Sequence, residues 1–176
     1  MIKNKKKNVK KIGILGGTFD PPHKGHLQIA KVSLKKLKLN KILWVLTNKN
    51  PLKKKPYLSL KQRIKLSKKI TKNYNKIFVK YFENSVKSTS TYDLLNYIKK
   101  KNKKSELFFL IGADNLMKLH KWKNWQKIPN LAKIIVFPRK SYSLNQTTFK
   151  KIYKKDILYI KSKKINISSS LIRKIW

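Results

Sequence analysis

Two histidines near the start of the chain have the spacing that chemistry on a phosphate requires. His23 and His26 are two of the chain's three histidines, and they follow a glycine pair, Gly16-Gly17. Their three-residue spacing places both imidazoles on one side of a helix that begins near His23, and Gly25 allows a close approach between them. Backbone N–H groups and the helix dipole at such a helix start favour an anion. The pair therefore predicts chemistry on a phosphate as well as phosphate binding.

A metal site is the weaker interpretation of the same two histidines. Zinc needs a third protein ligand, and no further His or carboxylate stands at a suitable spacing from His23 and His26. The chain has no cysteine, which excludes disulfides, thiolate metal sites and cysteine nucleophiles and is typical of a reducing cytosol. We therefore predict no metal bound by the protein itself.

A strand and a turn must position these histidines. The apolar run 12–15 predicts a short buried strand, Gly16 and Gly17 predict a turn, and a helix is predicted to follow at about 24–39. A glycine pair alone is equally typical of an ordinary tight turn. The continuation favours a phosphate site, because Pro21-Pro22 fixes the backbone ahead of His23 and Thr18 offers both an N–H and a hydroxyl.

The rest of the chain alternates predicted strands with predicted helices. Further strands are predicted at 42–46, 76–82, 107–111, 132–137 and 157–160, and further helices at 59–71, 91–100, 115–128 and 168–175; segment 141–155 is ambiguous. The alternation predicts an α/β fold, Rossmann-like and doubly wound, with a mainly parallel sheet of about five to six strands and helices on both faces. We expect one domain over 11–176 after a basic flexible tail at 1–10.

Five polar segments follow predicted strands at their carboxyl ends. In a parallel sheet these ends meet at one edge, and ligands bind there, near the point where the strand order reverses. The five segments are 16–26, 47–53, 88–91, 112–114 and 167–173. Their convergence predicts one site assembled from five loops, and it carries more weight than any single motif.

The charge of the chain is strongly positive. It has 46 Lys and Arg residues against 6 Asp and Glu, a formal net charge of +40, and such an excess favours phosphate-rich partners such as nucleic acid. The excess is nearly all lysine and is spread along the whole chain, which favours a bias in residue usage over a dedicated nucleic-acid surface. No apolar run reaches the roughly 20 residues of a membrane span and the start lacks a signal peptide, so we expect a cytoplasmic protein with no membrane partner.

Two segments resemble the signatures of the nucleotidylyltransferase superfamily. Residues 16–27, GGTFDPPHKGHL, resemble the first signature, His-x-Gly-His, and residues 167–173, ISSSLIR, resemble the second, Ile-Ser-Ser-Thr/Ser-x-Ile/Val-Arg. Within the superfamily the chain most resembles the bacterial nicotinate-nucleotide adenylyltransferases, because His23 stands where the phosphopantetheine enzymes usually have threonine. The segment 112–116, GADNL, followed by Trp122, is also similar to the nicotinate enzymes.

The resemblance implies a direct adenylyl transfer. The 5′-phosphate of nicotinate mononucleotide would attack the α-phosphorus of ATP in line, giving nicotinate adenine dinucleotide and pyrophosphate. No enzyme nucleophile is required, so the protein would position the substrates and stabilise phosphoryl charge, while Mg²⁺ would arrive with ATP. Two alternatives stay open: the same transfer to nicotinamide mononucleotide or phosphopantetheine, and, from another class, a basic nucleic-acid-binding protein. A homo-oligomer is also left open.

The resemblance also assigns residues to the substrates. The catalytic residues it implies are His23, His26 and Arg173, whose planar fork would hold the β- and γ-phosphates. ATP would also contact Gly16, Gly17, Thr18, Phe19, Asp114, Ile167, Ser168, Ser169 and Ser170, with Asp114 accepting from the ribose hydroxyls. The acceptor would contact Lys53, Ser90, Thr91 and Trp122, with the register around 88–91 left open.

Several of these residues have an ordinary structural role beside the functional one. Ser168–Ser170 are also typical of a helix N-cap, and Asp114 of a cap on the helix that follows it. Lys53 is one lysine among dozens. By analogy with the family we expect Asp20 to order its loop instead of touching substrate, and we expect Trp125 to pack in the core.

Overall fold

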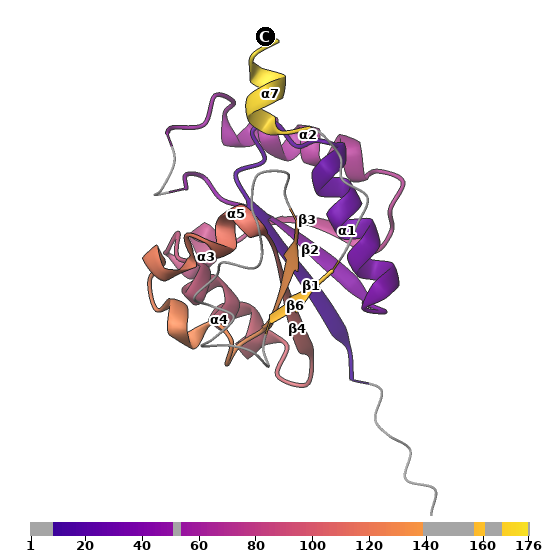
Figure 1. The fold of residues 1–176 in the computed structure, drawn as a ribbon, viewed down its shortest axis with the longest axis vertical. Helices are drawn as coiled ribbons and strands as arrows, with labels where there is room; N and C mark the ends of the chain where they lie inside the picture. Colours follow the sequence, from indigo (N-terminus) through magenta and orange to yellow (C-terminus); the bar gives the residue numbers. More distant parts are fainter. Residues whose placement is uncertain (1–8, 51–53, 139–156, 161–166, 176) are drawn as a thin grey trace, which may run out of the picture.

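The fold is a single parallel sheet, seen in a computed structural model that describes residues 9–50, 54–138, 157–160 and 167–175. The described strands form a 6-stranded sheet of order β3-β2-β1-β4-β5-β6, with every neighbouring pair parallel (Figure 1). They are β1 (Lys11–Gly17), β2 (Lys41–Leu46), β3 (Ile77–Tyr81), β4 (Glu106–Gly112), β5 (Lys133–Phe137) and β6 (Ile157–Tyr159). The order reverses between β1 and β4, which confirms the predicted doubly wound sheet.

Helices cover both faces of this sheet. One face carries α1 (Lys24–Lys36) and α2 (Leu60–Thr71) (Figure 1). The other carries α3 (Glu83–Val86), α4 (Thr91–Lys101) and α5 (Ala113–Leu116), together with the 3₁₀ turns η1 (Leu119–Lys121) and η2 (Trp125–Lys127). The short α7 (Ser169–Arg173) stands beyond the carboxyl edge of the strands. Within the described part of the chain, no helix has the length and apolar character needed to cross a membrane.

Alternate residues of each central strand enter two separate apolar cores. On β4, Leu107 and Phe109 pack with residues of α4 and α5, whereas Phe108 and Leu110 pack with residues of α1 and α2. Successive side chains of a strand point to opposite faces, so a strand covered on both sides has to be apolar at every position. The uninterrupted apolar runs of the sequence are therefore the buried strands.

Some predicted helix extents differ from the structure, as two segments illustrate. The helix predicted at 24–39 ends at Lys36, because Leu37 is its C-cap and Lys38 takes a left-handed φ of 50°. The segment before 88, expected to be a loop, contains α3, which ends where Lys87 takes a left-handed φ of 52°. Neither difference moves a strand end, so the edge that carries the site is unaffected.

The helix predicted at 115–128 is wrong. The chain forms α5, η1 and η2 instead, and Asn124 interrupts the segment with a left-handed φ of 52°. Leu116, Leu119 and Ile128 are nevertheless fully buried in the core. The spacing of these three residues fits a helix, but successive tight turns bury the same side chains. The turns also bring polar residues of the segment to the cavity described below.

Candidate active site

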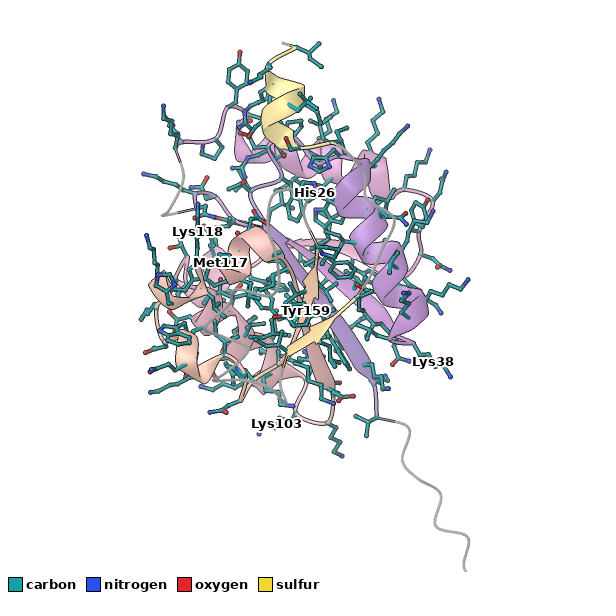
Figure 2. The ribbon with its side chains drawn as sticks, in the orientation of Figure 1. His26, Lys38, Lys103, Met117, Lys118 and Tyr159 are labelled. Carbon is teal, nitrogen blue, oxygen red and sulfur yellow. The ribbon has the colours of Figure 1, made fainter. Side chains whose placement is uncertain are left out.

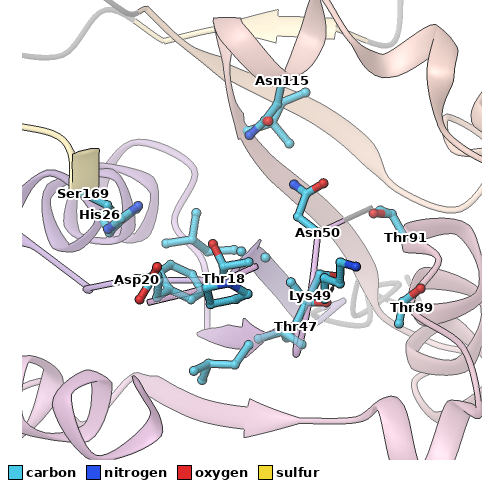
Figure 3. Close-up of a pocket in the computed structure, with 18 of the residues that line it drawn as sticks. Thr18, Asp20, His26, Thr47, Lys49, Asn50, Thr89, Thr91, Asn115 and Ser169 are labelled. Carbon is cyan, nitrogen blue, oxygen red and sulfur yellow. Dashed lines mark hydrogen bonds between the residues drawn. The ribbon is translucent and has the colours of Figure 1, made fainter. Parts of the chain in front are cut away.

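A cavity of about 690 Å³ opens at the carboxyl edge of the sheet. All five segments expected to converge there contribute to its wall, which includes Gly16–Asp20, His23, His26, Thr47, Ser88–Thr91, Asp114 and Arg173. Figure 3 shows His26 and Ser169 on one side of the cavity and Thr89 and Thr91 on the opposite side. Of the site residues assigned from the sequence, only Ile167 is described and absent from this wall; Lys53 lies outside the described residues.

The two histidines form the start of α1. Nδ1 of His23 accepts a hydrogen bond from the Gly25 N–H at 3.1 Å, and Nδ1 of His26 accepts one from the His23 N–H at 3.3 Å. Because each Nδ1 accepts, the proton of each neutral imidazole is on Nε2. The ring centroids are 3.8 Å apart. The cavity wall therefore holds two neighbouring Nε2–H donors at a helix N-terminus.

Two glycines shape this part of the site, Gly25 beside the His23 ring and Gly16 on the cavity wall. A Cβ on Gly25 would lie 2.9 Å from two atoms of the His23 ring, so any side chain there would displace the imidazole. A Cβ on Gly16 would meet nothing within 4 Å. No protein contact therefore requires glycine at position 16, and its exposed backbone faces the open cavity.

Phe19 supports His26 from inside the protein. Its ring is 2% exposed, stacks on Trp44 with centroids 4.5 Å apart, and meets the His26 ring edge-on at 4.9 Å. Phe19 also takes a left-handed φ of 49°, which turns the chain sharply after the glycines. Its side chain, assigned to ATP from the sequence, is thus mainly a packing surface for the imidazole.

The two signature segments are bonded to each other. Ser169 Oγ donates to the Pro21 carbonyl at 2.9 Å, and Arg173 Nη1 donates to the Asp20 carbonyl. Ser168 caps α7 by accepting from the Leu171 N–H at 3.1 Å, which is the structural role expected for it. The Ile167 side chain lies close to Gly25 and outside the cavity wall. The second signature is therefore held against the loop of the first.

Asp20 is the centre of this junction. Its carboxylate is buried and accepts from the N–H groups of Tyr57 at 2.8 Å and Leu58 at 2.9 Å. It also forms an ion pair with Arg173 Nη1 at 3.5 Å. One carboxylate thus joins the β1–α1 loop, the β2–α2 loop and α7, in agreement with the ordering role expected for it.

The segment 88–91 is organised by Asp93. Its carboxylate accepts from Ser88 Oγ at 2.7 Å and from Lys123 Nζ at 3.2 Å. The hydrogen bond from Ser88, followed by the bond and charge of Lys123, holds the pKa of Asp93 below its ordinary value in spite of partial burial. Ser90 is the N-cap of α4 and accepts from the Asp93 N–H at 3.4 Å. Its side chain therefore has a structural role, although Ser90 lines the cavity as Thr91 does.

Trp122 lies on the cavity wall between two lysines, Lys121 and Lys123. Its ring is half-buried and meets Phe109 edge-on, with centroids 6.1 Å apart. Trp125 packs against the core instead, as expected. A flat aromatic surface beside cationic side chains suits a ring that carries a negative charge.

Two charged residues at the cavity, Arg63 behind its wall and Glu83 on it, escaped the sequence analysis. Arg63 is 1% exposed, and burial lowers its pKa while the charges of Asp20, Glu83 and Tyr81 oppose that shift. Glu83 accepts from Thr47 Oγ1 and from the Asn48 N–H at 3.0 Å. Rarity was the available signal: Arg63 is one of three arginines among 46 basic residues, and Glu83 is one of six acids.

Surface charge is dispersed. Side chains with nitrogen tips project around the whole outline of the molecule, and Lys38, Lys103 and Lys118 mark three well-separated parts of it (Figure 2). Among the residues that the structure describes, no group of three or more His, Asp or Glu side chains is placed to hold a metal ion.

Comparisons with known proteins point in one direction. A family model described as cytidylyltransferase-like matches residues 14–175. The chain is 48% identical over 175 residues to a probable nicotinate-nucleotide adenylyltransferase of Pelagibacter ubique (98% of this chain, 96% of the relative), and 36% identical over 172 residues to one of Clostridium tetani (94% and 86%). It also resembles the solved structure of the Plasmodium falciparum nicotinic acid mononucleotide adenylyltransferase complexed with NaAD, with a TM-score of 0.79, 25% identity, and coverage of 94% of this chain and 83% of that one.

Proposed function

The chain belongs to the cytidylyltransferase-like family, and we propose that it transfers the adenylyl group of ATP to nicotinate mononucleotide. The near full-length relatives carry the name of this activity. The observation that carries the proposal is the pair of Nε2–H donors of His23 and His26 at the start of α1, on the wall of a cavity that Thr91 and Trp122 also line. The enzyme therefore belongs to NAD biosynthesis.

The reaction is one displacement at phosphorus. An oxygen of the 5′-phosphate of nicotinate mononucleotide bonds to the α-phosphorus of ATP as the bond from that phosphorus to the β-phosphate oxygen breaks. The products are nicotinate adenine dinucleotide and pyrophosphate. No protein atom becomes bonded to phosphorus, so the protein acts by alignment and by stabilising the charge that shifts onto the phosphoryl oxygens.

The ATP side of the site is assigned to the two signature segments. The imidazole Nε2–H groups of His23 and His26 donate to phosphoryl oxygens, and the bare backbone of Gly16–Thr18 approaches the same phosphates. Among the described residues, Arg173 uses Nη1 for Asp20 and one Nη2 hydrogen for Ser170 at 3.3 Å. Its remaining N–H groups hold the departing pyrophosphate. Ser168, Ser169 and Ser170 add donors there, and Asp114 accepts from the ribose hydroxyls.

The acceptor side is assigned to the opposite wall. Trp122 stacks on the nicotinate ring, and the neighbouring lysines attract the carboxylate of that ring. Ser90, Thr91 and Lys53 contact the mononucleotide. Magnesium enters with ATP, bound to its phosphates, since the described residues contain no carboxylate cluster for it. A cytoplasmic location, a homo-oligomer and the absence of a nucleic-acid partner stay predictions.

A panel of acceptors tests the proposal. Nicotinate mononucleotide, nicotinamide mononucleotide and phosphopantetheine are each offered with ATP and Mg²⁺, and pyrophosphate release is measured. We expect kcat/KM for nicotinate mononucleotide to exceed the others by at least about ten-fold, because a site built for a charged group discriminates against its absence. Equal rates with all three acceptors would contradict the assignment.

A further inference from the structure

A buried arginine stands behind the cavity without lining it. Arg63 lies in the first turns of α2, and its guanidinium donates four hydrogen bonds, all to backbone carbonyl oxygens. Nε donates to Leu58 at 3.1 Å, and Nη2 donates to Asn48 at 2.9 Å. Nη1 donates to both Thr18 and Thr47 at 2.7 Å. The guanidinium therefore lies where several segments of the chain come together.

These carbonyl groups belong to two loops that are far apart in sequence. Thr18 is in the turn after β1, directly beyond the glycine pair, whereas Thr47, Asn48 and Leu58 are in the loop between β2 and α2. A single nitrogen, Nη1, bonds one carbonyl from each loop. The spacing between the two loops is therefore fixed by the geometry of one planar group.

Two carboxylates accept hydrogen bonds from three of the same residues, Thr47, Asn48 and Leu58. The Asn48 N–H and the Thr47 hydroxyl donate to Glu83, and the Leu58 N–H donates to Asp20. Asp20 in turn forms the ion pair with Arg173. At Thr47, Asn48 and Leu58, the loop after β2 is thus bonded through carbonyl groups to a buried cation and through donors to two anions, which leaves these residues little freedom to shift.

We propose that Arg63 is a positioning residue that sets the relative placement of the ATP loop and the acceptor loop for in-line transfer. This inference rests on the proposed function. The turn at Thr18 is assigned above to the ATP phosphates, and the loop that begins at Thr47 contains Lys53, which is assigned to the acceptor. Thr18 and Thr47 both line the cavity (Figure 3). In-line attack depends on the separation and angle of these two phosphates, so a small relative shift of the loops reduces turnover.

Arginine is suited to this position and lysine is not. The other basic residues of α2 are all lysines, Lys61, Lys65, Lys68 and Lys69. An ammonium group has three donors around one point, whereas the guanidinium spreads five over a rigid plane and reaches carbonyl groups that lie on different sides of it. The substitution Arg63→Lys would keep the charge and lose the geometry that joins the two loops.

The test uses the full chain with two variants at this position and a matched control. Arg63→Lys keeps the charge, and Arg63→Met keeps an unbranched side chain without the charge. Thr71→Val is the control, because Thr71 is buried on the same helix and its hydroxyl donates to the Ser67 carbonyl at 2.8 Å, away from both loops. Tm is measured for each, and kcat and the two KM values are measured below the lowest Tm with both substrates present.

The expected result separates positioning from stability. In the folded Arg63 variants, kcat falls about 10- to 100-fold because the reacting groups are misaligned. KM rises for both ATP and nicotinate mononucleotide. Thr71→Val lowers Tm with kcat and both KM values unchanged. Arg63→Lys retains more activity than Arg63→Met because it can still bond one of the carbonyl groups.

Other outcomes overturn the inference. If the Arg63 variants lose Tm but keep the wild-type kcat and KM values, the arginine serves stability alone. If neither variant folds even with both nucleotides present, Arg63 is a determinant of folding and the positioning role is rejected. If wild type and Thr71→Val form no dinucleotide, the proposed function itself fails, and this inference falls with it.

Discussion

Arg173 and Asp20 are bonded to each other although 153 positions separate them: Arg173 Nη1 donates to the Asp20 carbonyl oxygen and lies 3.5 Å from its carboxylate. Because the same carboxylate accepts from the Tyr57 and Leu58 N–H groups, it connects α7 with the loops that follow β1 and β2. The placement of both signature segments therefore depends on the buried carboxylate of Asp20.

Asp20→Asn should loosen α7 and lower turnover. The amide loses the negative charge that pairs with Arg173 and presents an NH₂ group where the carboxylate accepted two backbone N–H groups. Leaving such donors unsatisfied costs about 1–3 kcal/mol. We expect a lower Tm together with a raised KM for ATP, measured by thermal unfolding and pyrophosphate release. A lower Tm with unchanged kinetics would restrict Asp20 to stability.

Arg173→Ala should weaken the hold on the leaving pyrophosphate. Removing one charge-stabilising donor from such a site typically lowers kcat by about 100-fold, and KM for ATP should rise more than KM for the acceptor. The kcat of Arg173→Lys, which keeps the charge without the planar guanidinium, should lie between those of wild type and Arg173→Ala. Wild-type kinetics in Arg173→Ala would show that the second signature is only a helix cap.

Gly25→Ala should reduce activity by displacing His23. The added Cβ would lie 2.9 Å from two atoms of the buried His23 ring and push the ring from its place. Because His23 is also the N-cap of α1, we expect a fall in kcat together with a lower Tm, since the loss of an N-cap costs about 1 kcal/mol. Unchanged kcat would mean that the position of the His23 ring does not matter for turnover.

Gly16→Ala is the companion variant. Its Cβ meets no protein atom within 4 Å and enters the cavity. It should therefore leave Tm near the wild-type value and raise KM for ATP. An unaltered KM would mean that the ATP phosphates do not approach the Gly16 backbone.

Asp93→Asn should affect the acceptor and leave ATP binding unchanged. The substitution removes the ion pair with Lys123 and weakens the order of segment 88–91, so KM for nicotinate mononucleotide should rise about 2- to 10-fold. Tm should change little, because an exposed ion pair contributes little to stability. Glu106→Gln is the control, because Glu106 pairs with Lys133 at the opposite end of the strands. An equal rise in KM in both variants would contradict a local role for Asp93.

The pH dependence of this contact follows from the lowered pKa of Asp93. A carboxyl whose pKa is depressed by folding contributes stability above its ordinary value of 3.8, and that contribution is lost as the pH falls through the lower folded value. We therefore expect no loss of the Asp93 contacts between about pH 5 and pH 8. Acceptor KM values measured across that range in wild type and Asp93→Asn should keep a constant ratio.

The strands and the place of the site could be predicted because their causes are local. An apolar run such as 107–111 can only be buried on both faces, and parallel strands bring their carboxyl ends together wherever the chain crosses over. The glycine pair and the two histidines are also contiguous in sequence. For these features a few neighbouring residues contain the necessary information.

The supporting contacts could not be predicted because their causes are tertiary. Arg63 lies in a helix otherwise rich in lysine, and only the folded chain places four carbonyl groups around it. The apolar spacing of Leu116, Leu119 and Ile128 fits one helix as well as α5, η1 and η2. Asp20 has no neighbour in sequence that identifies Arg173 as its partner.

The most direct test of the account measures dinucleotide and pyrophosphate formed from ATP, Mg²⁺ and nicotinate mononucleotide by wild type and by His26→Ala, side by side. Loss of the Nε2–H donor should lower kcat by about 100- to 1000-fold, with wild type forming dinucleotide and pyrophosphate in equal amounts. Formation of no dinucleotide by wild type, or equal turnover by His26→Ala, would contradict the claim that this histidine pair serves adenylyl transfer to nicotinate mononucleotide.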